Sequence, residues 1–408
     1  MISIYIHWPF CLSKCPYCDF NSHVSKNIDN DLWLKNYLHE LNIFLPVLKG
    51  KTVKTIFFGG GTPSLMPTAI VEEIINFIKK NAQCDEDLEI TLEMNPTSIE
   101  INKLYGFSQA GVNRVSIGIQ SLNNHSLKFL GRNHSAEEAL KCLELANRYF
   151  NNVSFDIIYG LPHQSIDDWK QECELAMKYV TNHVSLYQLM IEPDTKFYSL
   201  YKAGKLKPHN DEVLYAMYDY TNEQLNQHGL QRYEISNYAK NGYESKHNLV
   251  YWNYDEYLGI GPGAHSRLLY SDFISSLYIK NKMMAIKNME MQCSDVRKEI
   301  VNDINVRKQD GNNINPGMYN VYAMSQVSNP SLWLQGYNRT NIEFINRIEV
   351  AKEMIMMSLR TVYGMSMAKF YRYTGMCFKN YFGNLLQSFH DSNLLVFDKD
   401  YVILTSQG

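Results

Sequence analysis

The chain has 408 residues, of which 45% are hydrophobic and 20% charged, and its formal net charge is -3. Such a chain can bury a large core, and this composition is typical of a folded protein with one large and one smaller domain. The small negative charge favours no nucleic-acid partner, no run approaches the roughly 20 apolar residues of a membrane span, and the first residues lack the layout of a signal peptide.

The first predicted strand, residues 2–7, leads into a loop with three closely spaced cysteines, Cys11, Cys15 and Cys18. Three thiolates at these intervals can hold one iron-sulfur cluster, but a cubane cluster normally takes four cysteines, so one iron would keep an open position. A structural zinc site, a disulfide with a spare thiol and chance clustering remain alternatives, although no second close cysteine pair completes a zinc site. The other cysteines are placed singly, which favours a reducing compartment and therefore a cytoplasmic protein.

Short apolar runs alternate with helical patterns as far as about residue 190. Strands are predicted at 2–7, 55–58, 88–94, 114–119, 153–158 and 183–190, with helices between them at 31–48, 67–80 and 136–150. Repeating strand and helix units favour a parallel sheet with right-handed crossovers. The sequence therefore predicts an α/β fold, a partial (β/α)6 barrel whose functional residues gather beyond the carboxyl ends of the strands.

Several residues suited to ligand binding follow predicted strands. Gly61 and Thr62 end a triglycine turn, where missing side chains let a ligand approach the backbone closely. The other polar residues at strand ends or in adjacent loops are Glu93, Gln120, Arg132 and Asp156. Carboxylates and amides can hold ribose hydroxyls, and an arginine can hold a carboxylate, although each of these residues alone is more often structural.

The character of the sequence changes after residue 270. Residues 271–340 are predicted to be a polar insertion or linker, within which 278–315 receives no function. Residues 341–408 combine a helical pattern at 349–359 with two short apolar runs, 394–397 and 401–404, and predict a small α+β domain of winged-helix type. Its balanced charges favour packing or docking over DNA binding.

The cysteine loop and its surroundings resemble those of the radical S-adenosylmethionine (SAM) superfamily. The resemblance implies a four-iron four-sulfur cluster on the three cysteines, with SAM chelated to the free iron and cleaved to a 5'-deoxyadenosyl radical. It also implies SAM contacts at Tyr5, Tyr17, Gly61, Thr62, Glu93, Gln120, Arg132 and Asp156.

Two branches of that superfamily remain, and the cysteine loop separates them. In the oxygen-independent coproporphyrinogen III dehydrogenase a fourth cysteine follows the third by two residues, whereas this chain reads Cys18-Asp19-Phe20. The dehydrogenase also carries an extension before its first strand, which we expect to be missing here. Both departures resemble the HemW haem chaperone branch.

A further motif, His247-Asn248-Leu-Val-Tyr251-Trp252, is similar to one of the HemW branch. The resemblance implies haem contacts at His247, Tyr251 and Trp252, since imidazole is a plausible axial ligand and aromatic rings can pack on the macrocycle. A lone histidine is more often a satisfied hydrogen-bonding residue, and His265 after the next glycine-rich turn is a weaker candidate.

The resemblance implies a haem chaperone that passes haem to membrane-bound respiratory haemoproteins. Whether SAM is turned over, whether the protein forms a homodimer and whether it visits the inner face of the membrane are left open. The main alternative is a coproporphyrinogen III dehydrogenase; another radical SAM activity, such as RNA modification, predicts a basic surface that the sequence does not clearly display.

Overall fold

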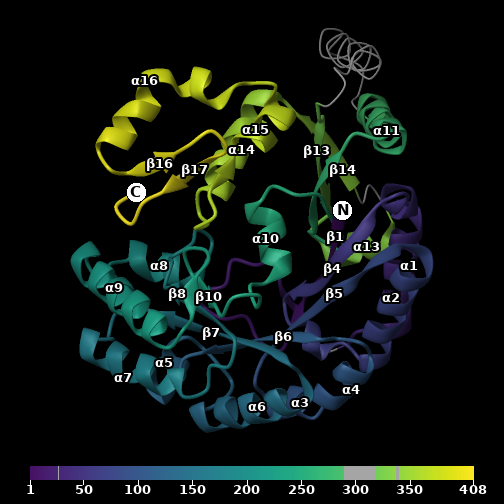
Figure 1. Cartoon of the computed structure of the whole chain (residues 1–408). Coiled ribbons are helices and arrows are strands. Elements are labelled where there is room, and N and C mark those ends of the chain that lie inside the picture. The colour runs from purple at the N-terminus through teal and green to yellow at the C-terminus, as the bar shows by residue number, and fades with distance from the viewer. Residues whose placement is uncertain (26, 289–317, 337–339) are drawn as a thin grey trace.

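The computed structural model describes residues 1–25, 27–288, 318–336 and 340–408, and its centre is a curved parallel sheet (Figure 1). Six strands lie side by side in chain order, each parallel to the next. They are β1 (Ile2–Trp8), β4 (Thr52–Gly60), β5 (Gln83–Met94), β6 (Arg114–Gln120), β7 (Asn152–Tyr159) and β8 (His183–Gln188). The predicted partial barrel is confirmed, and every predicted strand lies within or overlaps one of these six.

Helices cover the outer face of this sheet, as Figure 1 shows. They are α1 (Asn30–Leu48), α2 (Thr68–Asn81), α3 (Ser98–Ile101), α4 (Leu104–Gln109), α5 (Asn124–Phe129), α6 (Ala136–Tyr149) and α7 (Ile166–Met177). Ser135 and Ser165 begin α6 and α7 with capping boxes, in which each serine side chain accepts from the backbone three residues later. The apolar faces of α2 and α6 are buried on the strands, which fixes the strand ends relative to one another.

The same sheet continues beyond the six strands at both edges. Next to β1 lies the parallel strand β11 (Tyr257–Ile260), followed by the antiparallel strands β12 (His265–Leu269), β13 (Val321–Gln326) and β14 (Thr340–Ile345). At the other edge β10 (Asn237–Ala239) is antiparallel to β8, and β9 (Gln231–Arg232) is antiparallel to β10. The remaining helices of this part are α8 (Lys196–Lys202), α9 (Asp211–Gln227), α10 (Lys246–Trp252), α11 (Asp272–Asn288) and α13 (Pro330–Gln335).

Residues 318–336 differ from the linker expected over 271–340. They form β13 and α13, and Trp333 of α13 stacks on Trp33 of α1 with ring centroids 5.2 Å apart. This segment is therefore part of the main sheet and its core. Of the polar stretch predicted at 278–315, α11 covers the start, and residues 289–315 lie outside the described part of the chain.

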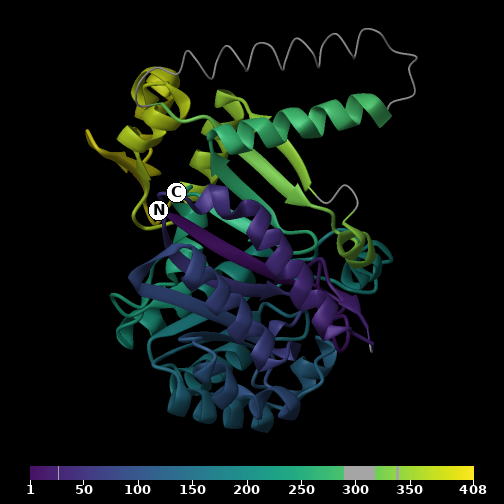
Figure 2. The same cartoon turned by 90° about the vertical axis from the view of Figure 1, so that its right-hand side faces the viewer.

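The last residues form the small α+β unit that the sequence predicts. Helices α14 (Arg347–Ser358), α15 (Met367–Thr374) and α16 (Phe378–Asp391) pack on a sheet of β15 (Met365–Ser366), β17 (Tyr401–Leu404) and β16 (Leu395–Phe397). Figure 2 shows this unit beside the β12–β14 extension, on the side of the barrel away from α3, α4 and α6. It has its own apolar core around Phe370.

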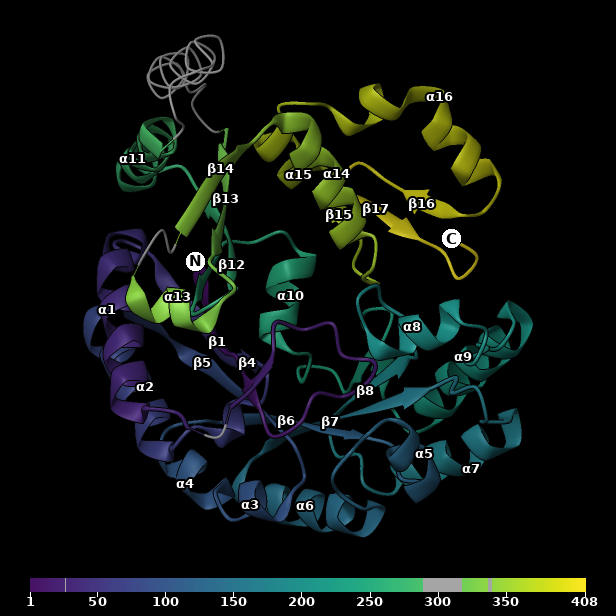
Figure 3. The ribbon, with the colours of Figure 1, turned by 180° about the vertical axis from the view of Figure 1, so that it is seen from behind.

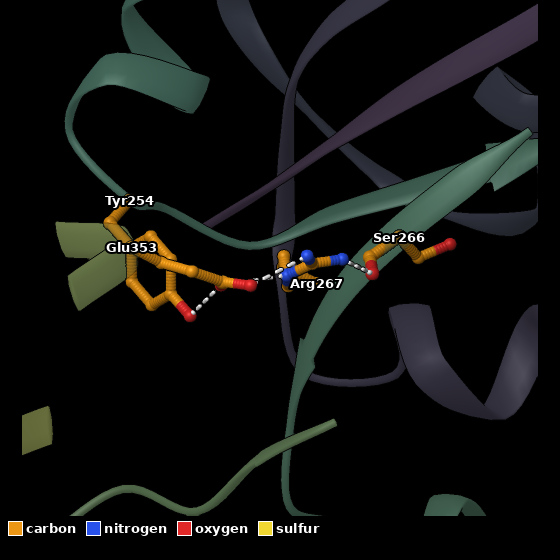
Figure 4. A network of polar contacts seen from close by, with 4 residues as sticks. All are labelled: Tyr254, Ser266, Arg267 and Glu353. Carbon is orange, nitrogen blue, oxygen red and sulfur yellow. Dashed lines mark hydrogen bonds and ion pairs between the residues drawn. The ribbon is translucent and has the colours of Figure 1, made fainter. Parts of the chain in front are cut away.

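A charged network joins α14 to the barrel (Figure 4). Arg267 of β12 makes a two-pronged ion pair with Glu353, with Nη2 2.8 Å from Oε1 and Nε 3.0 Å from Oε2. The Tyr254 hydroxyl donates to the same carboxylate at 2.5 Å. Together they hold the pKa of Glu353 below its ordinary value although the group is partly buried. In the described part of the chain, no helix is long and apolar enough to cross a membrane.

Candidate radical SAM site

A cavity of about 390 Å³ opens at the carboxyl ends of the parallel strands. The loop between β1 and α1 forms one wall, and strand ends and following loops form the rest. It brings together all three cysteines and seven of the eight predicted SAM contacts, which are Cys11, Cys15, Cys18, Tyr17, Gly61, Thr62, Glu93, Gln120, Arg132 and Asp156. The single predicted SAM contact outside the cavity lining is Tyr5.

The three cysteines lie half-buried on one wall of the cavity. A turn brings the last two together, since the Cys18 amide donates to the Cys15 carbonyl at 3.2 Å. Burial raises the pKa of the Cys11 and Cys18 thiols, and hydrogen bonds from Thr62 to Cys11 and from the Phe20 backbone to Cys18 oppose that rise. Donors aimed at sulfur favour the thiolate, which is the form that binds metal.

No group of three His, Cys, Asp or Glu side chains among the described residues is arranged to hold one metal ion. A cubane cluster does not require such convergence, because each thiolate binds a different iron. Three thiols that line one cavity thus fit a cluster with an open iron.

A chain of side-chain hydrogen bonds along the cavity wall links Cys15 to Cys11. Arg132 donates from Nη1 to the Cys15 sulfur at 3.5 Å and from Nη2 to Asn95 Oδ1 at 2.5 Å. Asn95 Nδ2 donates to Thr62 Oγ1 at 3.1 Å, and Thr62 Oγ1 donates to the Cys11 sulfur at 3.4 Å. Sequence reasoning did not select Asn95, although its place directly after β5 was a usable signal.

The end of the triglycine turn is tied to the chain that carries the cysteines. The Gly61 amide donates to the Trp8 carbonyl at 2.7 Å, and the Thr62 amide donates to the Phe10 carbonyl at 2.8 Å. A Cβ on Gly61 would lie 2.7 Å from the Phe10 carbonyl oxygen, so a side chain would push the two segments apart. Glycine is therefore required there by close approach of two backbones.

Two carboxyl groups line the cavity, Glu93 near the end of β5 and Asp156 within β7. Burial raises the pKa of Glu93 to about 8, and the nearby Asp156 carboxylate adds to this rise. The Gly60 amide, which donates to Glu93 at 3.3 Å, lowers the pKa in part. Burial also raises the pKa of Asp156 to about 6. Two such groups can accept from the hydroxyls of a bound nucleoside and would ionise more readily with a cation beside them.

Gln120 ends β6 in an unusual conformation, with φ of 70°. A left-handed backbone at a non-glycine residue costs about 1 kcal/mol or more. The register of β6 against β7 shifts between Gly118 and Gln120. A Cβ on Gly118 would lie 2.9 Å from Nε2 of the Gln120 side chain. The absence of a side chain on Gly118 therefore leaves space for the Gln120 side-chain amide beside the cavity.

Tyr5 lies under the cavity and contacts its frame. Its hydroxyl is 3.0 Å from His7 Nδ1, and its ring stacks on Phe57 with centroids 6.1 Å apart. His7 in turn bonds the Asn21 carbonyl through Nε2 at 2.9 Å. Tyr5 is thus placed to position the loop that carries the cysteines.

The residues predicted to contact haem are placed elsewhere, and none of them lines the cavity. His247 is 1% exposed; its Nδ1 lies 2.6 Å from Thr55 Oγ1 and its Nε2 lies 2.8 Å from the Tyr251 hydroxyl. Burial lowers the pKa of His247 to about 3. Trp252 lies beneath the Arg360 guanidinium of the C-terminal unit at 4.6 Å, and His265 is exposed at the start of β12. In this arrangement both nitrogens of His247 already have partners.

Two family models match the chain. The radical SAM superfamily covers residues 5–176, and the HemN C-terminal domain covers residues 345–408. The chain is 37% identical over 301 residues to the protein named heme chaperone HemW of Buchnera aphidicola subsp. Schizaphis graminum, an alignment that spans 70% of this chain and 79% of that one. The chain belongs to the HemW family of radical SAM proteins. Membership in the radical SAM superfamily implies a four-iron four-sulfur cluster and SAM as cofactors.

Other relatives agree on the family. The heme chaperone HemW of Escherichia coli is 39% identical over 275 residues, which is 66% of this chain and 71% of that one. A mitochondrial radical S-adenosyl methionine domain-containing protein 1 of Danio rerio is 39% identical over 268 residues, 65% of this chain and 60% of the relative. The solved structure of coproporphyrinogen III oxidase (HemN) from Escherichia coli has a TM-score of 0.72 at 19% identity, over 100% of this chain and 87% of that one, and shows the shared fold.

Proposed function

We propose that this protein is a haem chaperone that binds haem and passes it to acceptor haemoproteins, respiratory proteins of the membrane being the expected class, with the chaperone itself in the cytoplasm. The observation that carries the proposal is its similarity to proteins named heme chaperone HemW over 71% to 79% of their lengths. The cysteine loop supports it, because Asp19 and Phe20 follow Cys18 where the resembling dehydrogenase has a further cysteine.

Cys11, Cys15 and Cys18 hold the cluster in this proposal. When bound and reduced, the cluster supplies one electron to the sulfonium of SAM. In this proposal Arg132, which lines the cavity beside Cys15, holds the SAM carboxylate, because its planar guanidinium suits a carboxylate. Glu93, Asp156 and Gln120 accept from or donate to the nucleoside, Gly61 and Thr62 close the side nearest Cys11, and Tyr17 covers the loop. Tyr5 positions the frame through His7.

Haem contact at His247, Tyr251 and Trp252 remains a prediction. Binding of haem iron to His247 would require the hydrogen bond to Thr55 or the one to Tyr251 to break. Because His247 is only 1% exposed, it would also require α10 to move, against the hydrogen bonds that Glu89 accepts from the amides of the first two residues of α10. A ligand role therefore implies a conformational change that exposes α10.

The test uses anaerobically reconstituted protein. Haem is titrated with and without SAM, and the loaded protein is mixed with an apo-cytochrome whose absorbance reports transfer. We expect saturable haem binding and transfer faster than from free haem. The same preparation is given coproporphyrinogen III; formation of protoporphyrinogen would contradict the chaperone assignment and favour the dehydrogenase, whose fold this chain shares.

A further inference from the structure

Two turns beside the cavity are joined by one buried carboxylate, that of Glu172 in α7. Its Oε1 accepts from the Ser121 hydroxyl at 2.5 Å and from the Leu122 amide at 2.6 Å, directly after β6. Its Oε2 accepts from the side-chain amide of Gln164 at 3.0 Å. The side chains of Ser121, Gln164 and Glu172 are all buried. Figure 3 shows β6 and β7 side by side, with α7 on the outer side of the sheet.

Gln164 extends this connection to the turn after β7. Its Oε1 accepts from the Gly160 amide at 2.8 Å and from the Leu161 amide at 3.4 Å. Ile158, two residues before Gly160, lines the cavity, and Gln120 lines it from the end of the neighbouring strand. The pair of Glu172 and Gln164, here called the buried bridge, therefore ties together the ends of two strands that carry lining residues.

The buried bridge needs a carboxylate at one position and an amide at the other. Backbone amides of Leu122 and Gly160 stand at its two ends, so an oxygen must face each end. The side-chain nitrogen of Gln164 is then directed at Glu172 and needs an acceptor there. Protonation of Glu172, or the substitution Glu172→Gln, would place a second donor against that nitrogen. Burial raises the pKa of Glu172, and the hydrogen bonds from Ser121, Leu122 and Gln164 oppose that rise.

The buried bridge directly follows a strained residue of the cavity. Gln120 has a left-handed backbone, and such a conformation persists only where the surrounding structure holds it. The next two residues, Ser121 and Leu122, both donate to Glu172. Glu172 therefore supplies the contacts that hold the chain in this conformation where the Gln120 side chain lines the cavity.

We propose that Glu172 is a positioning residue for SAM, which fixes the backbone of Gln120 through the two residues that follow it, so that the Gln120 side chain meets the nucleoside. The proposal rests on the SAM site of the proposed function and is independent of haem transfer. Glu172 is not among the residues that line the cavity, so it acts through Gln120. Without the buried bridge the Gln120 side chain would adopt several orientations and its contact to SAM would weaken. The cluster would remain, because the cysteine loop holds it.

The test measures the Kd for SAM of the cluster-loaded full chain, with iron content as the check on the cluster. We expect Glu172→Gln to raise the Kd about tenfold at unchanged iron content, because it sets two donors against each other. The matched control Glu174→Gln removes the same charge from an exposed position of the same helix and should leave the Kd unchanged. The exchange Glu172→Gln/Gln164→Glu again gives each donor an acceptor, and should bring the Kd to within about twofold of the unaltered chain.

Two further measurements separate positioning from a general loss of stability. In a Gln120→Ala background, Glu172→Gln should raise the Kd by less than about twofold, because the contact that it supports is already gone. In ligand-free protein, amide hydrogen exchange over residues 120–124 and 160–165 should become faster together in Glu172→Gln and stay unchanged in Glu174→Gln. This exchange measurement needs neither cluster nor SAM.

A milder variant keeps the test decisive if Glu172→Gln does not fold. Ser121→Ala removes one of the donors and should raise the Kd about threefold, again only while Gln120 is present. An unchanged Kd in the variant that folds would overturn the proposal. An equal rise in the Gln120→Ala background would also overturn it, because the effect would not pass through Gln120.

The exchanged pair gives a further way to contradict the proposal. If Glu172→Gln/Gln164→Glu bound SAM as weakly as Glu172→Gln, the hydrogen bonds of the buried bridge would not be the cause and the positioning role would be wrong. If the unaltered cluster-loaded chain bound no SAM, the cofactor site of the proposed function would fail and the positioning role with it. Normal SAM binding that Glu172→Gln leaves unchanged would defeat the role of Glu172 alone.

Discussion

The cavity at the barrel rim and the buried motif around His247 were both selected by resemblance, yet they differ in what their polar groups do. In the cavity the carboxyl groups of Glu93 and Asp156 have raised pKa values and face open volume. Around His247 both ring nitrogens are bonded and the side chain is 1% exposed. A motif can thus mark either a ligand-binding site or a set of buried contacts that stabilises the fold. The two differ in whether the polar groups of the motif are already hydrogen-bonded within the protein.

The joint around His247 also lies next to the C-terminal unit. Trp252 of α10 stacks beneath Arg360, whose side chain is 3.5 Å from Glu234, and Lys369 of α15 reaches the Asp255 carboxylate. Through Tyr254, the same stretch joins the network of Arg267 and Glu353. The chain between β10 and β12 therefore connects the barrel interior to the C-terminal unit.

Replacing a cluster cysteine should have the largest effect, a loss of the cluster, and this effect should be confined to the cavity. We expect Cys11→Ala to lose nearly all cluster iron and the broad visible absorbance of reconstituted protein while the barrel stays folded, because two thiolates are too few to hold the cluster. Iron and sulfide analysis with circular dichroism measures this. The control Cys84→Ala alters a cysteine outside the cavity lining and should keep its cluster. A full cluster in Cys11→Ala would refute the ligand assignment.

Replacing His247 should instead lower the stability of the fold. His247→Ala removes a ring stacked on Phe57 and leaves the hydroxyls of Thr55 and Tyr251 without their partner, so we expect the free energy of unfolding to fall by about 3 kcal/mol. SAM affinity measured below the unfolding transition should stay unchanged. Thr55→Val, which removes one of the two hydrogen bonds, should cost less. A variant of full stability that retains haem poorly would instead favour a direct haem contact.

Removing charge from the network in Figure 4 should have a smaller effect. Glu353→Gln removes the charge that Arg267 faces, at side chains only 23% and 25% exposed, and should lower the free energy of unfolding by about 2 kcal/mol. The matched control lies on the same helix: Glu349→Gln breaks an exposed pair with Lys352 and should change stability by less than about 0.5 kcal/mol. Urea unfolding of both variants measures the difference. Equal losses would mean that burial of the pair contributes nothing.

The sequence predicted the barrel and its cavity well because both follow from local patterns. Apolar runs and helical periodicity predicted β1 and β4 to β8, and the carboxyl ends of parallel strands necessarily share one edge. The short strands β9 to β13 were not predicted, because two to six residues give little periodicity and their pairing is decided by distant partners. Asn95 was missed for a related reason, since its value lies in bridging Arg132 and Thr62 across the cavity.

The environment of His247 could not be read from its motif. Residues 247–252 fit a helix, but the partner Thr55 lies on β4, 192 positions away in sequence, and only the folded sheet brings the two together. An imidazole suited to haem and an imidazole suited to a buried hydrogen-bonded joint have the same local sequence. What separates them is tertiary packing.

The smallest expected effect is a difference in how the cavity and the surroundings of His247 make stability depend on pH. Glu93 has a folded pKa of about 8 against an ordinary value of 4.5, so between these values the unfolded chain releases a proton that the folded protein keeps, and stability falls as pH rises. His247 has a folded pKa of about 3 against 6.5, so the unfolded chain takes up a proton in that window and stability falls as pH falls. The two slopes oppose each other between 4.5 and 6.5.

Of Glu93 and His247, only Glu93 acts between pH 6.5 and 8, and there the unfolding free energy of ligand-free protein should drop by about 1.7 kcal/mol. Glu93→Gln should flatten this part of the curve and leave the part below pH 4.5 unchanged, as urea midpoints at pH 3.5, 4.5, 6.5 and 8 would record. His247→Gln should leave the alkaline slope unchanged and make the slope below pH 4.5 less steep; His7 and His134, whose pKa values burial lowers to about 4, keep the rest of that slope. If Glu93→Gln kept the full alkaline slope, the Glu93 carboxyl would already be ionised in the ligand-free cavity. Its pKa would then not be raised, and protonation would not distinguish the cavity from the buried surroundings of His247.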